Sequence, residues 1–312
     1  MGRAYLAGQE WVVVIRVQGL TRYYGKLCAV RDISFEVHRG EVFGLLGSNG
    51  AGKSTTIKML CGLLKPTRGS VSIAGVDLAR HPLRAKAMLG YLPENPVLYD
   101  RLTGMEMLEL VGALRKLSPK LLRQRAEYYG KALDLEGQMQ SEVGTYSKGM
   151  RQKLAIAMTL VHDPEVVLLD EPASGLDPRY TRLLKEWVRN LSQGGHTVLL
   201  STHILHDVEQ VCDHVIIVSQ GRLQIVEQVE SLLARLEDWV EVRVGEPRAA
   251  FCAALDKRKL EWQEHGPALR VGFRGDETFD AILAAAGESG APLLQMERAT
   301  RALEDLYLEV VK

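Results

Sequence analysis

The segment from Gly47 to Ser54 constrains the fold of this chain more than any other. Its sequence, Gly-Ser-Asn-Gly-Ala-Gly-Lys-Ser, fits the phosphate-loop pattern G-x-x-x-x-G-K-[ST]. In such a loop the glycines let the backbone close around a polyphosphate, Lys53 offers a charge to the β and γ phosphates, and Ser54 offers a hydroxyl to Mg²⁺. The apolar run 41–46 predicts a buried strand and residues 55–60 predict a helix, which is the context that the pattern requires.

Composition limits the class of protein. A chain of 312 residues with 46% hydrophobic residues can bury a full core, and its length suggests one large domain plus a smaller one. Lysine plus arginine and aspartate plus glutamate both total 39, so the formal net charge of zero gives no global signal for nucleic acid or an anionic membrane. The four cysteines form no C-x-x-C motif and no Cys/His cluster, so we expect reduced thiols in a cytosolic protein, without a zinc site or a disulfide framework.

The amino-terminal residues do not have the pattern of a signal peptide. Gln9 and Glu10 interrupt the apolar residues there, and Arg16 ends the run Trp11–Ile15. Nowhere do about 18 apolar residues follow one another, so we expect no segment that crosses a bilayer as a helix. If this protein serves a membrane, we expect it to dock on something that spans the membrane.

The pattern of apolar residues predicts an α/β fold. Short apolar pieces between residues 11 and 46 are separated at Gly19, at Tyr24-Gly25 and at Arg39-Gly40, and they predict strands joined by turns. Residues 96–163 predict a helical insertion, in which four apolar residues recur at three-residue spacing: Met105, Leu108, Val111 and Leu114. Further strands are predicted at 70–73, 166–169, 197–200 and 215–218. Helical stretches between the last three favour a largely parallel sheet.

The character of the chain changes near Glu237. From there the pattern predicts the order βαββαβ and a closing helix at 301–310, which favours a small α+β, ferredoxin-like domain over 237–312. The predicted strands are 239–244, 260–263, 269–273 and 292–296, and the predicted helices are 247–255 and 279–286.

Two carboxylates follow the apolar strand 166–169. Asp170 is suited to hold Mg²⁺, usually through water, and Glu171 could orient or deprotonate an attacking water. The alternative is a helix N-cap, which an acidic pair after a buried strand often provides. Pro172 and the motif downstream favour a catalytic role for the acidic pair.

Three further motifs complete a recognisable order. The segment Tyr146–Gln152 precedes the acidic strand, Ser174–Asp177 follows it, and His203 comes just after the strand that ends at Ser201. In this order and spacing, residues 15–235 resemble the signature motif, Walker B, D-loop and switch histidine of the ATP-binding cassette superfamily. The resemblance implies a P-loop NTPase cassette at 11–236, with an antiparallel β subdomain, a mostly parallel core sheet and a helical subdomain at about 96–163.

The resemblance also implies a site for ATP and Mg²⁺. Catalysis would fall to Glu171, His203 and Lys53. Mg²⁺ would be held by Ser54, Glu94 and Asp170. The ATP-binding residues would be Tyr24, Gly47, Ser48, Asn49, Gly50, Ala51, Gly52, Lys53, Ser54 and Thr55.

Tyr24 matches the aromatic residue that stacks on adenine in this superfamily. Stacking of this kind contributes about 1–3 kcal/mol where it has been measured for bases. Tyr23 is adjacent and would point to the opposite face of a strand, so the register decides between the two. We favour Tyr24, and the alternative is a core or turn tyrosine.

The superfamily pairs head to tail, so the resemblance implies a homodimer with two ATP molecules between two phosphate loops and two opposed signatures. Ser147 and the Gly149 amide would contact the γ-phosphate of the ATP on the partner copy. Lys148 and Met150 complete this signature, and Asp177 lies in the D-loop. The alternative for Ser147 is the N-cap of an ordinary helix. His206 and His214 match no motif and are expected to be surface or packing residues.

Two departures from the common cassette pattern indicate a subclass. Glu94 stands where a glutamine usually contacts Mg²⁺ and the transporter, and the signature reads Tyr-Ser-Lys-Gly-Met in place of Leu-Ser-Gly-Gly-Gln. Both departures, and the ending Leu303–Leu308, resemble type-2 exporter ATPases. The resemblance implies an ATP-hydrolysing subunit of an exporter, bound to separately encoded integral membrane subunits at the cytoplasmic face of the plasma membrane, with no nucleic-acid partner.

Two other hypotheses remain open at this point. A soluble cassette ATPase acting on ribosomes or DNA is less favoured, because ribosome-acting relatives usually carry two cassettes and DNA-acting ones carry long coiled coils or zinc modules. A non-hydrolysing structural subunit is disfavoured because Lys53, Ser54, Asp170, Glu171 and His203 are all present. The cargo is not encoded in any motif of this chain.

Overall fold

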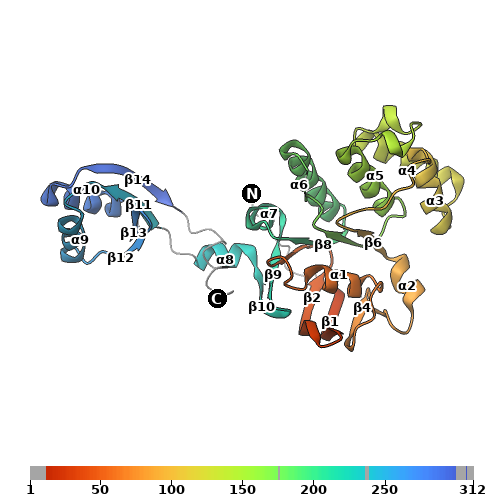
Figure 1. The fold of residues 1–312 in the computed structure, drawn as a ribbon, viewed down its shortest axis with the longest axis horizontal. Helices are drawn as coiled ribbons and strands as arrows, with labels where there is room; N and C mark the ends of the chain where they lie inside the picture. Colours follow the sequence, from red (N-terminus) through yellow and green to blue (C-terminus); the bar gives the residue numbers. More distant parts are fainter. Residues whose placement is uncertain (1–11, 175, 236–238, 300–306, 308–312) are drawn as a thin grey trace. The chain divides into compact units, whose positions relative to one another are not determined.

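The computed structural model describes residues 12–174, 176–235, 239–299 and Tyr307. The chain separates into two compact units, Met1–Val229 and Glu230–Lys312, and each is described by itself (Figure 1). The predicted domain border between residues 236 and 237 lies outside the described residues and stays a prediction. No helix of the described residues is long and apolar enough to cross a membrane.

The first unit begins with an antiparallel sheet in the order β2-β1-β4-β5. Its strands are β1 (Val13–Tyr24), β2 (Leu27–His38), β4 (Arg68–Ile73) and β5 (Val76–Asp77). The predicted turn at Gly19 is wrong, because β1 continues through it. Gly19 has a φ of +58°, and the register with β2 shifts between Val17 and Leu20, so the glycine forms a bulge inside one long strand.

The core sheet of this unit has the order β10-β9-β3-β8-β7-β6, and all its pairs are parallel except β10 with β9. The strands are β3 (Val42–Leu46), β6 (Leu89–Leu92), β7 (Val166–Asp170), β8 (Thr197–Thr202), β9 (His214–Ser219) and β10 (Arg222–Gln228). Every residue of β3, β7 and β8 is buried, as expected for parallel strands covered on both faces. The predicted mostly parallel sheet is confirmed.

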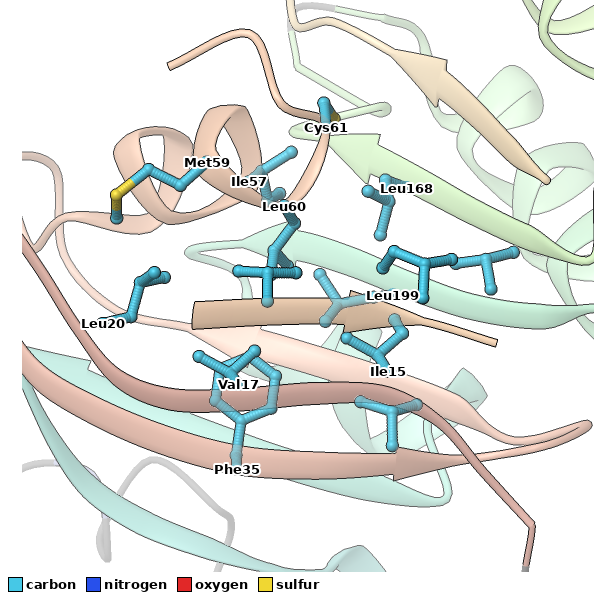
Figure 2. Packing of buried hydrophobic residues seen from close by; sticks show 14 of the residues in the cluster. Ile15, Val17, Leu20, Phe35, Ile57, Met59, Leu60, Cys61, Leu168 and Leu199 are labelled. Carbon is cyan, nitrogen blue, oxygen red and sulfur yellow. The ribbon is translucent and has the colours of Figure 1, made fainter. Parts of the chain in front are cut away.

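Both sheets share one core with helix α1 (Lys53–Leu60) (Figure 2). Ile57 and Leu60 of α1 pack in one cluster with Val17 of β1, Leu168 of β7 and Leu199 of β8, and all five are at most 1% exposed. Burying each such side chain contributes about 1.5–3 kcal/mol. This cluster fixes α1, and with it the loop that precedes α1, against the ends of the core strands.

The helical insertion gathers beside the β6 edge of the core sheet (Figure 1). Its helices are α3 (Gly104–Leu114), α4 (Pro119–Ala132) and α5 (Lys148–Leu160), with 3₁₀ turns at Glu136–Gln138 and Val143–Thr145, whereas α2 (Pro82–Ala87) comes before β6 and outside the insertion. A capping box between Thr103 and Glu106 starts α3. The four apolar residues that predicted a helix here all lie within α3; Leu108 among them is buried, whereas Leu114 at the end of the helix is 75% exposed. Helices α6 (Pro178–Gln193) and α7 (Leu205–Val211) belong to the core.

The second unit has the predicted element order βαββαβ. After α8 (Val229–Arg235) come β11 (Trp239–Val244), α9 (Arg248–Lys257), β12 (Trp262–His265), β13 (Ala268–Gly272), α10 (Glu277–Ser289) and β14 (Leu293–Ala299). The antiparallel sheet has the order β12-β13-β11-β14, which is the ferredoxin-like order. Phe251 and Leu255 of α9 and Ile282 of α10 pack on Val240 and Val242 of β11. The predicted helix 301–310 and the ending 303–308 lie outside the described residues, apart from Tyr307.

Candidate nucleotide site

The phosphate-loop segment connects β3 to α1, and two of its glycines are required by close packing. A Cβ on Gly47 would lie 2.5 Å from the carbonyl oxygen of Val218. A Cβ on Gly52, whose φ is +103°, would lie 2.7 Å from the carbonyl oxygen of Ala29. The loop therefore reaches the N-terminus of α1 through space that only glycine fits. A helix N-terminus carries partial positive charge, so this position suits an anion.

The side chain of Lys53 is 5% exposed and points back under the loop. Its Nζ donates hydrogen bonds to the carbonyl oxygens of Gly47 at 2.7 Å and Ser48 at 3.3 Å. The same nitrogen lies 3.0 Å from Oε1 of Glu171. The lysine is thus held at the inner surface of the loop, with its charge paired to the acidic residue that follows β7.

The paired carboxylates at the end of β7 face the loop. Asp170 is 2% exposed, and its Oδ1 accepts hydrogen bonds from the hydroxyls of Ser54 at 3.0 Å and Ser201 at 2.7 Å. Oε2 of Glu171 lies 3.0 Å from Nδ1 of His203. Neither carboxylate caps α6; Asp177 does, since its Oδ1 accepts from the backbone N–H of Tyr180 at 2.9 Å. The N-cap alternative for the acidic pair is therefore wrong.

The phosphate loop, Glu171 and His203 border one open pocket of about 360 Å³. It is lined by Ala29, Ser48, Asn49, Gly50, Gly52, Lys53, Ser54, Thr55, Glu94, Glu171, Ser174 and His203. The fold thus brings Glu94 and His203, which are far apart in the sequence, to the phosphate loop. Ala29 and Ser174 were not among the predicted residues. The sequence carries no local signal for Ala29, because its position depends on how β2 packs over the loop.

Tyr24 lies outside this pocket lining, at the end of β1. Its side chain is 46% exposed, and the guanidinium carbon of Arg22 lies 4.9 Å from its ring centroid. Tyr23 is 41% exposed. The stacking role of Tyr24 stays a prediction.

The signature segment lies at the start of α5, and none of its residues lines the pocket. The hydroxyl of Ser147 caps this helix by accepting from the N–H of Met150 at 3.2 Å. Lys148 donates from Nζ to the carbonyl oxygen of Ser174 at 3.4 Å. The N-cap role of Ser147 is therefore present, and it leaves the hydroxyl hydrogen available to another acceptor.

The two histidines without a motif have the expected places. His206 is on the surface, with a side chain 69% exposed. His214 is a packing residue whose ring stacks on Phe43 at a centroid distance of 4.7 Å. Burial lowers the pKa of His214, and the nearby Glu41 and Asp213 carboxylates oppose this effect.

A mostly parallel α/β sheet whose glycine-shaped loop faces a paired carboxylate at the end of a second strand defines the P-loop nucleoside triphosphatases. The family model described as ABC transporter matches residues 30–174. The ABC transporter ATP-binding protein NatA of Bacillus subtilis is 40% identical over 205 residues, which are 65% of this chain and 83% of that protein. The linearmycin resistance ATP-binding protein LnrL of Bacillus subtilis is 32% identical over 78% of each chain. The chain belongs to the family of ABC transporter ATP-binding proteins.

Solved structures agree with this family. A structure described as the ATP binding subunit of an ABC transporter has a TM-score of 0.67 at 36% identity, covering 71% of this chain and 92% of that one. CbiO1 from Clostridium perfringens, described as part of the ABC transporter complex cbiONQ, has a TM-score of 0.65 at 26% identity, covering 72% and 91%. The predicted family, cassette fold and ATPase activity are confirmed: the protein is the ATP-binding subunit of an ABC transporter, which hydrolyses ATP to drive transport. The comparisons give no support to a ribosome- or DNA-acting cassette.

Proposed function

We propose that this ATPase serves an exporter, and that its working form is a homodimer in which each ATP is held by the phosphate loop of one copy and the signature of the other. The observation that carries this proposal is that only some of the predicted ATP-site residues line the pocket of a single copy. Lys53, Glu171 and His203 meet around one pocket, whereas Ser147 and Gly149 do not line it. A second copy would bring the missing half.

Within one copy, the loop amides, the N-terminus of α1 and Lys53 would bind the β and γ phosphates. Glu171 would orient or deprotonate the attacking water, because its carboxylate is held between Lys53 and His203 at 3.0 Å from each. His203 would donate a hydrogen bond to the γ-phosphate and to the water. The protein thus contributes position and charge, which account for most of the catalysis of phosphoryl transfer.

The donor set fits magnesium. The Ser54 hydroxyl donates a hydrogen bond to the Asp170 carboxylate at 3.0 Å, and Ser54 and Glu94 line one pocket. All three offer oxygen ligands, and Mg²⁺ in nucleotide sites is typically bound by one or two carboxylates plus the substrate phosphates. When bound, Mg²⁺ neutralises charge on the β and γ phosphates. Ser54, Asp170 and Glu94 would hold it.

The partner copy would complete the site through the N-terminus of α5. Ser147 is exposed there and keeps its hydroxyl hydrogen for a phosphate oxygen, and the Gly149 N–H belongs to the first turn of the helix. The D-loop Asp177 would lie at the same interface. ATP favours the closed dimer, and loss of the γ-phosphate after hydrolysis removes these contacts, so the dimer reopens.

Membrane-spanning partner subunits would receive this motion at the cytoplasmic face of the plasma membrane. A groove of about 340 Å³ runs between the core and the helical insertion, next to Glu94. Leu63 and Val97 border it and are 62% and 90% exposed. Exposed apolar side chains around a groove are typical of protein interaction sites. Export is supported by relatives such as the Nod factor export ATP-binding protein I of Ralstonia nicotianae, which is 37% identical over 67% of this chain and 65% of that protein.

Mixing two inactive variants tests the composite site. Lys53→Ala removes the phosphate lysine and Ser147→Arg blocks the signature, so each variant alone should lose hydrolysis. In a mixture about half of the dimers are mixed, and each mixed dimer has one intact site, so activity should return to about a quarter of the wild-type rate. Adding the Lys53→Ala, Ser147→Arg double variant to Lys53→Ala restores no intact site and serves as the control. Absence of recovery in the first mixture would contradict the homodimer.

A further inference from the structure

Ser201 lies where two strands meet behind the candidate site. It is 0% exposed, near the end of β8, and pairs with Asp170 of β7 in the parallel register. Its Oγ donates a hydrogen bond to Oδ1 of Asp170 at 2.7 Å and accepts one from the backbone N–H of Glu171 at 2.9 Å. One buried hydroxyl is therefore bonded to both residues of the acidic pair.

The bond to Asp170 restricts the rotation of that carboxylate. Oδ1 of Asp170 accepts from Ser201 of β8 and from Ser54 of α1, so two hydroxyls from different elements hold one carboxylate oxygen. A serine hydroxyl has one hydrogen to donate, and here it goes to Asp170, which leaves the lone pairs for Glu171. Both bonds thus depend on the same atom.

The bond to Glu171 holds a strained backbone. Glu171 has a φ of +46°, in the left-handed region that residues with a Cβ adopt at a cost in energy. Its N–H is satisfied by Ser201, and this turn of the chain directs the side chain to Lys53 and His203. His203 itself follows Ser201 by two residues, so the end of β8 and the residue directly after it carry both the anchor of the acidic pair and the predicted switch histidine.

We propose that Ser201 is a positioning residue for ATP hydrolysis: its hydroxyl sets the orientation of Asp170 toward Mg²⁺ and of Glu171 toward the attacking water. This proposal rests on the proposed roles of Asp170 and Glu171. Ser201 does not line the pocket, so we place it as a residue that acts through these two carboxylates. No sequence motif of the chain marks it, because the bond depends on the pairing of β7 with β8.

Removal of the hydroxyl tests the role. Ser201→Ala should lower kcat about tenfold or more and leave KM for ATP within about threefold of wild type, because small displacements of catalytic groups reduce the chemical step. Ser201→Thr keeps a hydroxyl and should recover most of kcat. Ser201→Cys keeps the side-chain volume but has only a weak hydrogen-bond donor, so its kcat should fall as in Ser201→Ala. A loss of kcat in a folded Ser201→Cys variant would therefore come from the missing hydrogen bond and not from a packing defect.

A second readout does not depend on hydrolysis. Binding of a fluorescent ATP analogue is titrated with Mg²⁺, and the Mg²⁺ concentration for half-maximal binding should rise several-fold in Ser201→Ala and stay near wild type in Ser201→Thr. Ser192→Ala is the matched control. It removes another buried hydroxyl, 6% exposed and donating to the Gly40 carbonyl oxygen at 2.7 Å, away from the site.

Three outcomes would overturn the proposal. The first is wild-type kcat and Mg²⁺ dependence in Ser201→Ala. The second is an equal loss of kcat in Ser201→Ala and Ser192→Ala, and the third is a Ser201→Thr variant as impaired in kcat as Ser201→Ala. Failure of the proposed function has a different signature: Asp170→Asn and Glu171→Gln would then leave Mg²⁺ dependence and hydrolysis unchanged, whatever the behaviour of Ser201.

Discussion

The ammonium nitrogen of Lys53 lies 3.0 Å from Oε1 of Glu171, and the two side chains are only 5% and 10% exposed. A charge pair this far from solvent is sensitive to the loss of one member, since the other is left buried without a counter-charge. Lys53 also donates to the carbonyl oxygens of Gly47 and Ser48, which moderates that penalty. The predicted phosphate lysine and the predicted catalytic glutamate are thus coupled in the folded protein.

Glu171→Gln keeps the shape of the side chain and removes its charge. We expect the nucleotide-free variant to lose about 1–3 kcal/mol of unfolding free energy, because the buried ammonium loses its counter-charge. Hydrolysis should fall at least about 100-fold, since the proposed general base is gone. Mg-ATP should raise the melting temperature more in the variant than in the wild type, because phosphates then supply the negative charge. Thermal unfolding with and without Mg-ATP measures the loss of stability and the stabilisation by the nucleotide, and an ATPase assay measures the loss of hydrolysis.

Glu186→Gln provides the control for this substitution. Glu186 pairs with Arg182 at 3.4 Å on the surface of α6, and its side chain is 55% exposed. Exposed pairs of this kind contribute little to stability, so neither melting temperature nor hydrolysis should change. Equal changes in melting temperature for Glu171→Gln and Glu186→Gln would show that the buried Lys53–Glu171 pair contributes no more to stability than an exposed ion pair.

His203→Ala removes the ring whose Nδ1 lies 3.0 Å from Oε2 of Glu171. We expect kcat for ATP hydrolysis to fall about 10²-fold, the usual scale for the loss of a group that takes part in proton transfer or its orientation. Binding of ATP should change little, since Lys53 and the loop remain. His206→Ala, on an exposed ring three residues away, should keep wild-type kcat. Steady-state ATPase assays compare the two, and similar rates would remove His203 from the mechanism.

The sequence was informative where a feature is local. The phosphate loop is contiguous, and its strand and helix neighbours are long apolar runs, so both the loop and the parallel core around it could be predicted. The βαββαβ order of the second unit followed from period and turn residues in the same way. Features that depend on strand pairing could not be predicted: the sequence around Gly19 favours a turn, and only the register of β1 with β2 reveals the bulge there.

The same limit applies within the site. Glu94 and His203 were predicted from the superfamily resemblance, and the fold places both beside the loop. Ser201 and Ala29 were missed, because a serine in an apolar strand and an alanine in β2 have no distinctive neighbours in the sequence. Their positions follow from strand order and register, which bring β8 against β7 and β2 against the loop.

Substituting alanine at two glycines distinguishes the stability cost of a left-handed backbone from the cost of a steric clash. Gly69 and Gly75 have φ angles of +88° and +75°. A Cβ on Gly69 would lie 2.4 Å from the carbonyl oxygen of Gly19 and 2.5 Å from that of Gln18, whereas a Cβ on Gly75 meets nothing within 4 Å. Gly75→Ala should therefore cost about 1–2 kcal/mol, and Gly69→Ala at least about 2 kcal/mol more, since backbone atoms must move. Urea unfolding measures both, and equal losses would contradict the proposed clash at Gly69.

His162 gives the folded protein a defined sensitivity to acid. Its Nε2 donates to the Leu89 carbonyl oxygen at 2.9 Å, and burial, reinforced by the Arg115 guanidinium, lowers its pKa to about 4. An unfolded histidine has a pKa of about 6.5, so between these values the unfolded chain binds the proton more readily. The free energy of unfolding should fall as the pH drops from about 6.5 toward 4, by about 1–2 kcal/mol from this group after allowance for its partial exposure. Below about pH 4 both states carry the proton, and the contribution stops changing.

His162→Gln removes the titrating group and keeps an amide that can donate to Leu89. Urea unfolding at pH 7 and pH 5 should show a smaller loss of stability in this variant than in the wild type, because the unfolded state no longer gains a proton at that position. His206→Gln, at an exposed ring, should retain the wild-type difference between the two pH values. Identical pH dependence in His162→Gln and the wild type would mean that the His162 ring is protonated in the folded protein as easily as in the unfolded chain, and that the contacts around Leu89 and Arg115 do not hold it neutral.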